Sequence, residues 1–218
     1  TLSGRTVREE LDVSGDSKVV LMLGGISRIK GTLELVKAMS LVRKRMPEAR
    51  CIISGCYSLP LGVNLWLLRF ARLFGFKRYS ERVKALVKKD GLEKHVTFLP
   101  FRNDVPQLIA ASDLVVFPSK LPHFARPVIE AGAMAKPVVA SRIGGVEEAV
   151  EHGVTGMLVP PGDVKALADA IVQVLGDEKL AARLGNEGFV RARRLFDAEV
   201  NVAQTMDVYD RLLKSKRG

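Results

Sequence analysis

The chain has 218 residues and a formal net charge of +10, with 47% hydrophobic and 27% charged residues. This mixture is typical of a globular protein and excludes a disordered tail or a fibrous repeat. The charge predicts an anionic partner: nucleic acid, a membrane surface or a phosphorylated ligand. Aromatic residues make up only 6%, and the sequence has no aromatic RNA-binding box, which argues against a reader of single-stranded RNA.

Short apolar runs alternate with amphipathic helical stretches along the chain. The runs that we expect to form strands are Val19–Leu23, Ala49–Ile53, Val96–Leu99, Leu114–Phe117, Val138–Ala140 and Met157–Val159. The helices that we expect cover 33–46, Asp104–Ala111, Pro127–Ala135, a stretch capped by Asp163, and two further segments ending at Leu213. This alternation predicts an α/β fold: one doubly wound Rossmann-like domain whose parallel sheet carries helices on both faces, with a ligand crevice at the carboxyl ends of the strands.

Residues 51–68 carry no formal charge, and this stretch of 18 residues is long enough to be a candidate for a membrane span. Gly55, Pro60, Gly62 and Asn64 interrupt this stretch, so we interpret it as a buried strand, a loop and the start of a helix. The two cysteines are five residues apart without nearby histidines, which indicates reduced thiols and a cytoplasmic location rather than a disulfide framework or a zinc site. The chain begins with threonine, so we expect a fragment of a longer protein.

Three loops between expected strands and helices could carry chemistry. The first, Gly24–Gly31, contains glycines that would let backbone amides approach an anion, and Lys30 could add a charge. A tight turn with a solvated lysine explains this loop equally well. The second, Pro118–Glu130, ends in a helix whose first turns hold Glu130, either as an acceptor for two ribose hydroxyls or as an acid that favours the helix dipole. His123 fits an ordinary loop imidazole, and the third loop, Ser141–Glu148, indicates only a tight turn.

Together these segments resemble the C-terminal, nucleotide-sugar-binding half of a retaining glycosyltransferase of the GT-B architecture, in the family that includes bacterial mannosyltransferases and sucrose and glycogen synthases. The pattern G-R-x4-K-G is approximated by Gly24–Gly31, and A-D-x4-P-S by 112–119. The pattern E-G-F-G-x-P-x-x-E-A-x-A-x-G-x-P-V-V-A-S is approximated by Pro122–Ser141. G-G-x-x-E and T-G-x-L-V-P-P-G-D are met by Gly144–Glu148 and Thr155–Asp163.

The resemblance implies that the whole chain, 1–218, is the donor-binding domain, and that the acceptor domain of the enzyme lies outside it. Glu130 would bind the ribose hydroxyls, Lys30 would contact the diphosphate, and the base would lie near Leu99 and Arg102. The other donor-binding residues that it implies are Gly24, Gly25, Phe124, Ala125, Arg126 and Val128. The nucleotide sugar is expected as a co-substrate, with no metal and no cofactor, and transfer would proceed by front-face attack assisted by the leaving phosphate.

The sequence departs from the family pattern at two positions. Pro122 stands where the family has the first glutamate of its Glu-x7-Glu motif, which faces the transferred sugar, so the catalytic residues stay unassigned. Gly25 stands where the family has an arginine that contacts the diphosphate, and such a loss costs several kcal/mol of transition-state stabilisation. We therefore expect either an enzyme that is active only as the full-length protein, with the isolated chain inactive, or a degenerate sugar-nucleotide-binding or scaffold domain.

An insertion at about 57–79 separates the second strand from its helix. Trp66, Phe70 and Phe74 are spaced four apart, and the segment 69–94 holds nine basic and three acidic residues, which accounts for six of the ten net charges. Residues 61–94 could therefore lie on an anionic membrane surface, which would make the protein peripheral on the cytoplasmic membrane. Equally, they could pack on the acceptor domain or on the core. Because the charge is concentrated here, we do not expect a nucleic-acid partner.

Overall fold

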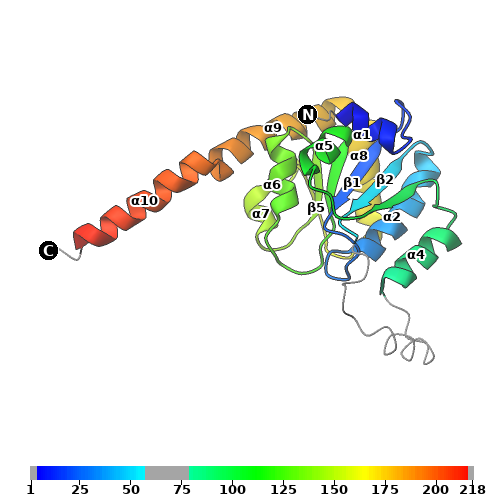
Figure 1. Ribbon diagram of the computed structural model, residues 1–218, viewed down its shortest axis with the longest axis horizontal. Helices are drawn as coiled ribbons and strands as arrows, with labels where there is room; N and C mark the ends of the chain where they lie inside the picture. The colour runs from blue at the N-terminus through cyan, green and yellow to red at the C-terminus, as the bar shows by residue number, and fades with distance from the viewer. Residues whose placement is uncertain (1–3, 57–78, 216–218) are drawn as a thin grey trace, which may run out of the picture.

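The computed structural model describes residues 4–56 and 79–215 and contains one six-stranded parallel sheet (Figure 1). Its strand order is β3-β2-β1-β4-β5-β6, the order of a doubly wound Rossmann-like domain. The strands are β1 (Val19–Leu23), β2 (Arg50–Ser54), β3 (Val96–Leu99), β4 (Leu114–Phe117), β5 (Val138–Ser141) and β6 (Met157–Val159). The predicted α/β class and all six predicted strands are confirmed, with ends that shift by a residue at β2 and β5.

Helices cover both faces of the sheet, because its strands are apolar on both sides. The core on one face is formed with α2 (Thr32–Arg45), α4 (Tyr79–Lys89) and α8 (Val164–Gly176). The core on the other face is formed with α1 (Gly4–Glu10), α5 (Val105–Ala111), α6 (Arg126–Ala133) and α7 (Val146–Ala149). The predicted cap of α8 is confirmed, since a carboxylate oxygen of Asp163 accepts a hydrogen bond of 2.9 Å from the amide of Ala166.

Two of these helices, α1 and α7, were not predicted from the sequence. Both are short, with seven and four residues, so periodicity gives little signal for them. The helix α1 buries Val7 under the sheet and reaches the core through that side chain. The helix α7 begins within the third loop, just after Gly145, whose φ of 84° lies in the left-handed region that favours glycine.

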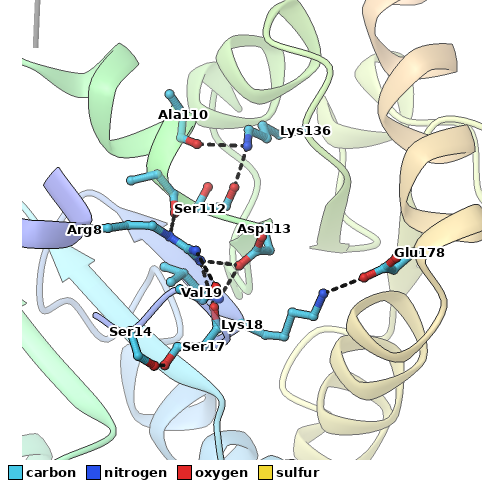
Figure 2. A network of polar contacts seen from close by, with 12 residues as sticks. Arg8, Ser14, Ser17, Lys18, Val19, Ala110, Ser112, Asp113, Lys136 and Glu178 are labelled. Carbon is cyan, nitrogen blue, oxygen red and sulfur yellow. Dashed lines mark hydrogen bonds and ion pairs between the residues drawn. The ribbon is translucent and has the colours of Figure 1, made fainter. Parts of the chain in front are cut away.

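A polar network ties α1 to the amino-terminal ends of β1 and β4 (Figure 2). One carboxylate oxygen of Asp113 accepts hydrogen bonds from the guanidinium of Arg8 at 2.8 Å and from the amide of Val19 at 2.7 Å. Arg8 also donates to the carbonyls of Ala111 and Ser17. The network therefore satisfies the first amide of the central strand and fixes α1 on the sheet.

The last helix, α10 (Ala198–Ser215), follows α9 (Glu178–Phe196) and extends away from the rest of the protein (Figure 1). The residues from 198 to 214 are all exposed. Val202, Met206, Tyr209 and Leu213 follow the three- and four-residue spacing of one helical face, and each is more than half exposed. An amphipathic helix of this kind normally buries its apolar face against a partner.

The insertion predicted at about 57–79 lies outside the described residues, except for its last residue, and so does its aromatic face. The helix that follows it, α4, turns its apolar side inward, because Val83 and Val87 are buried in the core. Its basic residues Arg82, Lys84 and Lys88 are exposed. Among the described helices, none combines the length and the apolar character needed to cross a membrane.

Candidate functional site

A cavity of about 430 Å³ opens where β1, β2 and β4 end, beside the point at which the winding of the sheet reverses. Ligands of open α/β sheets bind at this place, because the loops there diverge to opposite faces of the sheet. The cavity is lined by Leu23, Gly24, Lys30, Ser54, Gly55, Phe101, Arg102, Val105, Phe117, His123, Phe124, Arg126, Pro127 and Glu130. The charged side chains in this set are Lys30, Arg102, Arg126 and Glu130.

The loop after β1 brings Lys30 to the cavity. Its ammonium group donates one hydrogen bond of 2.9 Å to the carbonyl of Gly24, which leaves two of its three hydrogens for a ligand. Gly31 follows with a φ of 70°, and a side chain there would overlap the carbonyl of Pro118. In the Lys-Gly pair of the motif, the lysine thus places a cation at the cavity, and the glycine lets the loop after β1 approach the loop after β4 closely.

The loop after β4 is fastened to this first loop. The hydroxyl of Ser119 donates to the carbonyl of Ile29 at 3.0 Å, and the amide of Lys120 donates to the same carbonyl at 2.7 Å. The Pro-Ser pair of the motif is therefore structural, since Ser119 is buried and joins the two loops. These bonds fix the backbone from which His123 and Phe124 enter the cavity.

The helix α6 begins at the cavity and supplies its acid and one of its cations. The guanidinium of Arg126 lies 3.5 Å from a carboxylate oxygen of Glu130, one turn further along. Burial raises the pKa of Glu130, and the nearby charge of Arg126 opposes part of that shift. A partly buried carboxylate at this place can accept hydrogen bonds from two hydroxyl groups.

The loop after β3 contributes Arg102 and Phe101. Arg102 donates two hydrogen bonds to Asp104, at 2.7 and 2.6 Å, and two to Glu10 of α1, at 2.5 and 2.9 Å. The predicted base-loop arginine is thus committed to these two acids, which hold its pKa above its ordinary value, and it braces the loop against α1. Phe101 lies between the two predicted base-loop residues but was not itself singled out, and it is 65% exposed on the cavity wall.

Six of the predicted residues lie on this cavity: Gly24, Lys30, Arg102, Phe124, Arg126 and Glu130. The other four lie elsewhere. Gly25 is buried with a φ of 72°, against the carbonyl of Gly55. Ala125 precedes α6, and Val128 packs in the core because it lies on the buried side of that helix. Leu99 lines a neighbouring hollow with Cys56 and Pro100. The donor roles predicted for these residues remain predictions.

The doubly wound sheet with its cavity at the switch point defines the class of fold: a Rossmann-like domain with a ligand site at the carboxyl ends of its strands. The sequence profile of the glycosyl transferases group 1 family matches residues 4–191. The chain therefore belongs to that family, and the resemblance found in its motifs is confirmed.

Curated relatives are enzymes of sugar transfer and are longer than this chain. D-inositol 3-phosphate glycosyltransferase of Corynebacterium glutamicum (strain R) is 29% identical over 205 residues, which cover 93% of this chain and 46% of the relative. N-acetyl-alpha-D-glucosaminyl L-malate synthase of Bacillus anthracis is 33% identical over 132 residues, 61% of this chain and 35% of the relative. The chain thus spans about half or less of the length of these relatives.

Solved structures share the same fold. Anabaena Alr3699/HepE in complex with UDP and glucose is 31% identical, with a TM-score of 0.78, over 94% of this chain and 51% of that one. The C-terminal domain of a glycosyl transferase group 1 family protein (LpcC) from Francisella tularensis is 22% identical, with a TM-score of 0.71. That similarity covers 91% of this chain and all of the other, so an isolated domain adopts this fold.

Proposed function

We propose that this chain is the donor-binding half of a retaining glycosyltransferase and that its cavity binds a nucleotide diphosphate sugar. The main observation in support of this proposal is the cavity at the switch point, where Lys30 and Arg126 provide positive charge and Glu130 provides a carboxylate. A diphosphate needs cations and backbone amides, and a ribose needs an acceptor for its hydroxyls. The HepE structure with UDP and glucose supports this assignment.

Four of the lining residues have a role in this proposal. Lys30, fixed by the carbonyl of Gly24, binds the diphosphate and stabilises charge that develops on it as the sugar leaves. Glu130 accepts hydrogen bonds from the ribose hydroxyls. Phe101 covers one face of the base, and the brace of Arg102 holds the loop that carries it. We do not assign a metal to any of these steps.

The transfer reaction belongs to the longer protein, in which a further domain supplies the acceptor, a glycan or a lipid-linked molecule. The apolar face of α10 supports a partner of this kind, because Val202, Met206 and Tyr209 are exposed and this helix extends away from the sheet (Figure 1). The isolated chain would then bind the donor without turning it over. A transfer assay that finds the full rate with the chain alone would overturn this part of the proposal.

Calorimetry with UDP, GDP and ADP tests donor binding. Saturable binding of one nucleotide, weakened by Lys30→Met, supports the proposal. The matched control is Lys165→Met, because Lys165 on α8 pairs with Asp169, one turn away, and is not a described lining residue of the cavity. Loss of binding in both variants, or in neither, would count against the role of Lys30.

A second candidate function is a degenerate sugar-nucleotide-binding or scaffold domain. It is favoured by Pro122 and Gly25, which stand where the family pattern has a glutamate and an arginine. This candidate predicts either no nucleotide binding at millimolar concentration, or binding without transfer in the full-length protein. The same titration, followed by a transfer assay of that protein, separates the two functions.

The membrane hypothesis for residues 61–94 stays a prediction. The described part of this segment supports attraction by charge rather than insertion, because α4 exposes Lys84 and Lys88 and buries Val83 and Val87. Co-sedimentation with vesicles tests it: a preference for anionic over neutral vesicles that is lost in Lys84→Glu/Lys88→Glu supports attachment, and equal binding to both kinds contradicts it.

A further inference from the structure

We propose that His123 is a donor-binding residue whose Nε2 accepts a hydrogen bond from a hydroxyl group of the donor's sugar. This inference rests on the proposed function, because it takes a nucleotide sugar as the ligand of the cavity. It was not expected from the sequence, in which His123 resembled an ordinary loop residue. Three points carry it: the position of the ring, the tautomer that its contacts imply, and the polar groups around it.

The ring of His123 is held in place on the cavity wall. Its centroid lies 5.0 Å from that of Phe117, the last residue of β4, and both residues line the cavity. Its Nδ1 lies 3.0 Å from the carbonyl of Leu121 and 3.2 Å from the hydroxyl of Ser119. The orientation of the imidazole is therefore set by one ring contact and two polar contacts, before any ligand arrives.

These contacts determine which nitrogen carries the hydrogen. A carbonyl oxygen can only accept, so Nδ1 donates to Leu121 and must be protonated. In the neutral ring Nε2 then has a free lone pair and is an acceptor. Within residues 4–56 and 79–215, no hydrogen bond to Nε2 is formed. An acceptor nitrogen of this kind suits a hydroxyl group of a sugar.

The other polar groups of the cavity suit other parts of the donor. Lys30 and Arg126 are cations that suit the diphosphate, and Arg102 is committed to Glu10 and Asp104. Glu130 supplies the only carboxylate among the described lining residues, and in the proposed function this carboxylate accepts hydrogen bonds from the ribose hydroxyls. His123 thus supplies an acceptor that the sugar needs, one residue after Pro122, whose ring cannot accept a hydrogen bond.

The test compares a nucleotide with its sugar conjugate by calorimetry: UDP with UDP-glucose, and equally GDP with GDP-mannose and ADP with ADP-glucose. Asparagine places its amide near Nδ1 and can keep the bond to Leu121 while it removes Nε2. Glutamine reaches as far as Nε2 and keeps an acceptor there. We expect His123→Asn to weaken binding of the conjugate about fivefold, the value of one neutral hydrogen bond, with the free nucleotide changed less than about twofold. His123→Gln should retain more of the affinity for the conjugate.

The matched control is His95→Ala. The Nδ1 of His95 also contacts a carbonyl, that of Ala49 at 3.2 Å, but His95 is not a lining residue of the cavity. This variant should leave the ratio of conjugate to nucleotide affinity unchanged. An unchanged ratio in His123→Asn, equal ratios in its Asn and Gln variants, or parallel loss of both ligands would overturn the inference while nucleotide binding stands. Absence of all nucleotide binding in the unsubstituted chain would instead overturn the proposed function, and the inference with it.

Discussion

Replacement of Asp113 by alanine should destabilise the domain strongly without changing its cavity. The carboxylate accepts from the amide of Val19, a fully buried residue, so this amide would lose its partner away from water. A buried donor left unsatisfied costs about 1–3 kcal/mol. The partly exposed ion pair with Arg8 adds no more than about 1 kcal/mol, because solvent screens it.

The total is about 3 kcal/mol, which corresponds to a fall in melting temperature of about 6–12 °C for a domain of this size. Asp113→Asn should cost less, because its amide oxygen can still accept from Val19. The matched control is Glu9→Ala on α1, which removes an exposed pair with Arg5 and should change the free energy of unfolding by no more than about 0.5 kcal/mol.

Thermal and urea unfolding, followed by circular dichroism, measure these differences. Nucleotide affinity should be the same in Asp113→Asn and in the unsubstituted chain, since Asp113 directly precedes β4, whereas the cavity lies at the carboxyl ends of the strands. A loss for Asp113→Ala no larger than that for Glu9→Ala would refute the role assigned to this network.

Four further outcomes follow from the cavity and from α10. Lys30→Met should weaken UDP binding by roughly 10- to 100-fold, the value of charge-assisted hydrogen bonds, and leave uridine binding unchanged in the same titration. Because burial raises the pKa of Glu130, UDP affinity should fall with decreasing pH earlier than for an ordinary glutamate, and Glu130→Gln should lack this decline when affinity is measured across pH. Phe101→Ala should weaken UDP binding about tenfold and Phe101→Tyr should restore it; equal affinities would contradict base stacking. Met206→Ser should leave the melting temperature of this chain unchanged and, if the proposed further domain packs on α10, lower that of the longer protein.

The fold was predictable from the sequence because its strands are short and apolar and are separated by amphipathic helical stretches. The helices α1 and α7 were missed since seven and four residues give no clear period. Their omission mattered, because α1 supplies Arg8 to the central strand and Glu10 to the brace of Arg102. Contacts between residues roughly a hundred positions apart leave no local pattern for a reader of the sequence to find.

The sequence was sufficient to predict which loops form the candidate site, but it did not predict the direction in which each side chain points. Lys30 and Glu130 lie on the cavity as their motifs indicated. Val128 does not, because the geometry of α6 turns it into the core two residues before Glu130. Arg102 was expected near the base of the donor, and the ion pairs of its guanidinium with Glu10 and Asp104 were not predicted.

Neither departure from the family pattern, at Pro122 or at Gly25, falls on a described lining residue of the cavity, and the frame that joins its two loops is formed. The frame consists of the close approach of Gly31 to Pro118 and the bonds of Ser119 and Lys120 to Ile29, none of which involves position 122. Pro122 is exposed between these fixed points, so its side chain does not hold the loop in place. The neighbouring imidazole of His123 contacts the ring of Phe117 and the carbonyl of Leu121. In our proposal it accepts a hydrogen bond from a sugar hydroxyl without any rearrangement of the backbone. Because the frame is retained, we expect donor binding to be retained as well. The ratio of conjugate to nucleotide affinity in His123→Asn then measures how much His123 contributes to binding of the sugar.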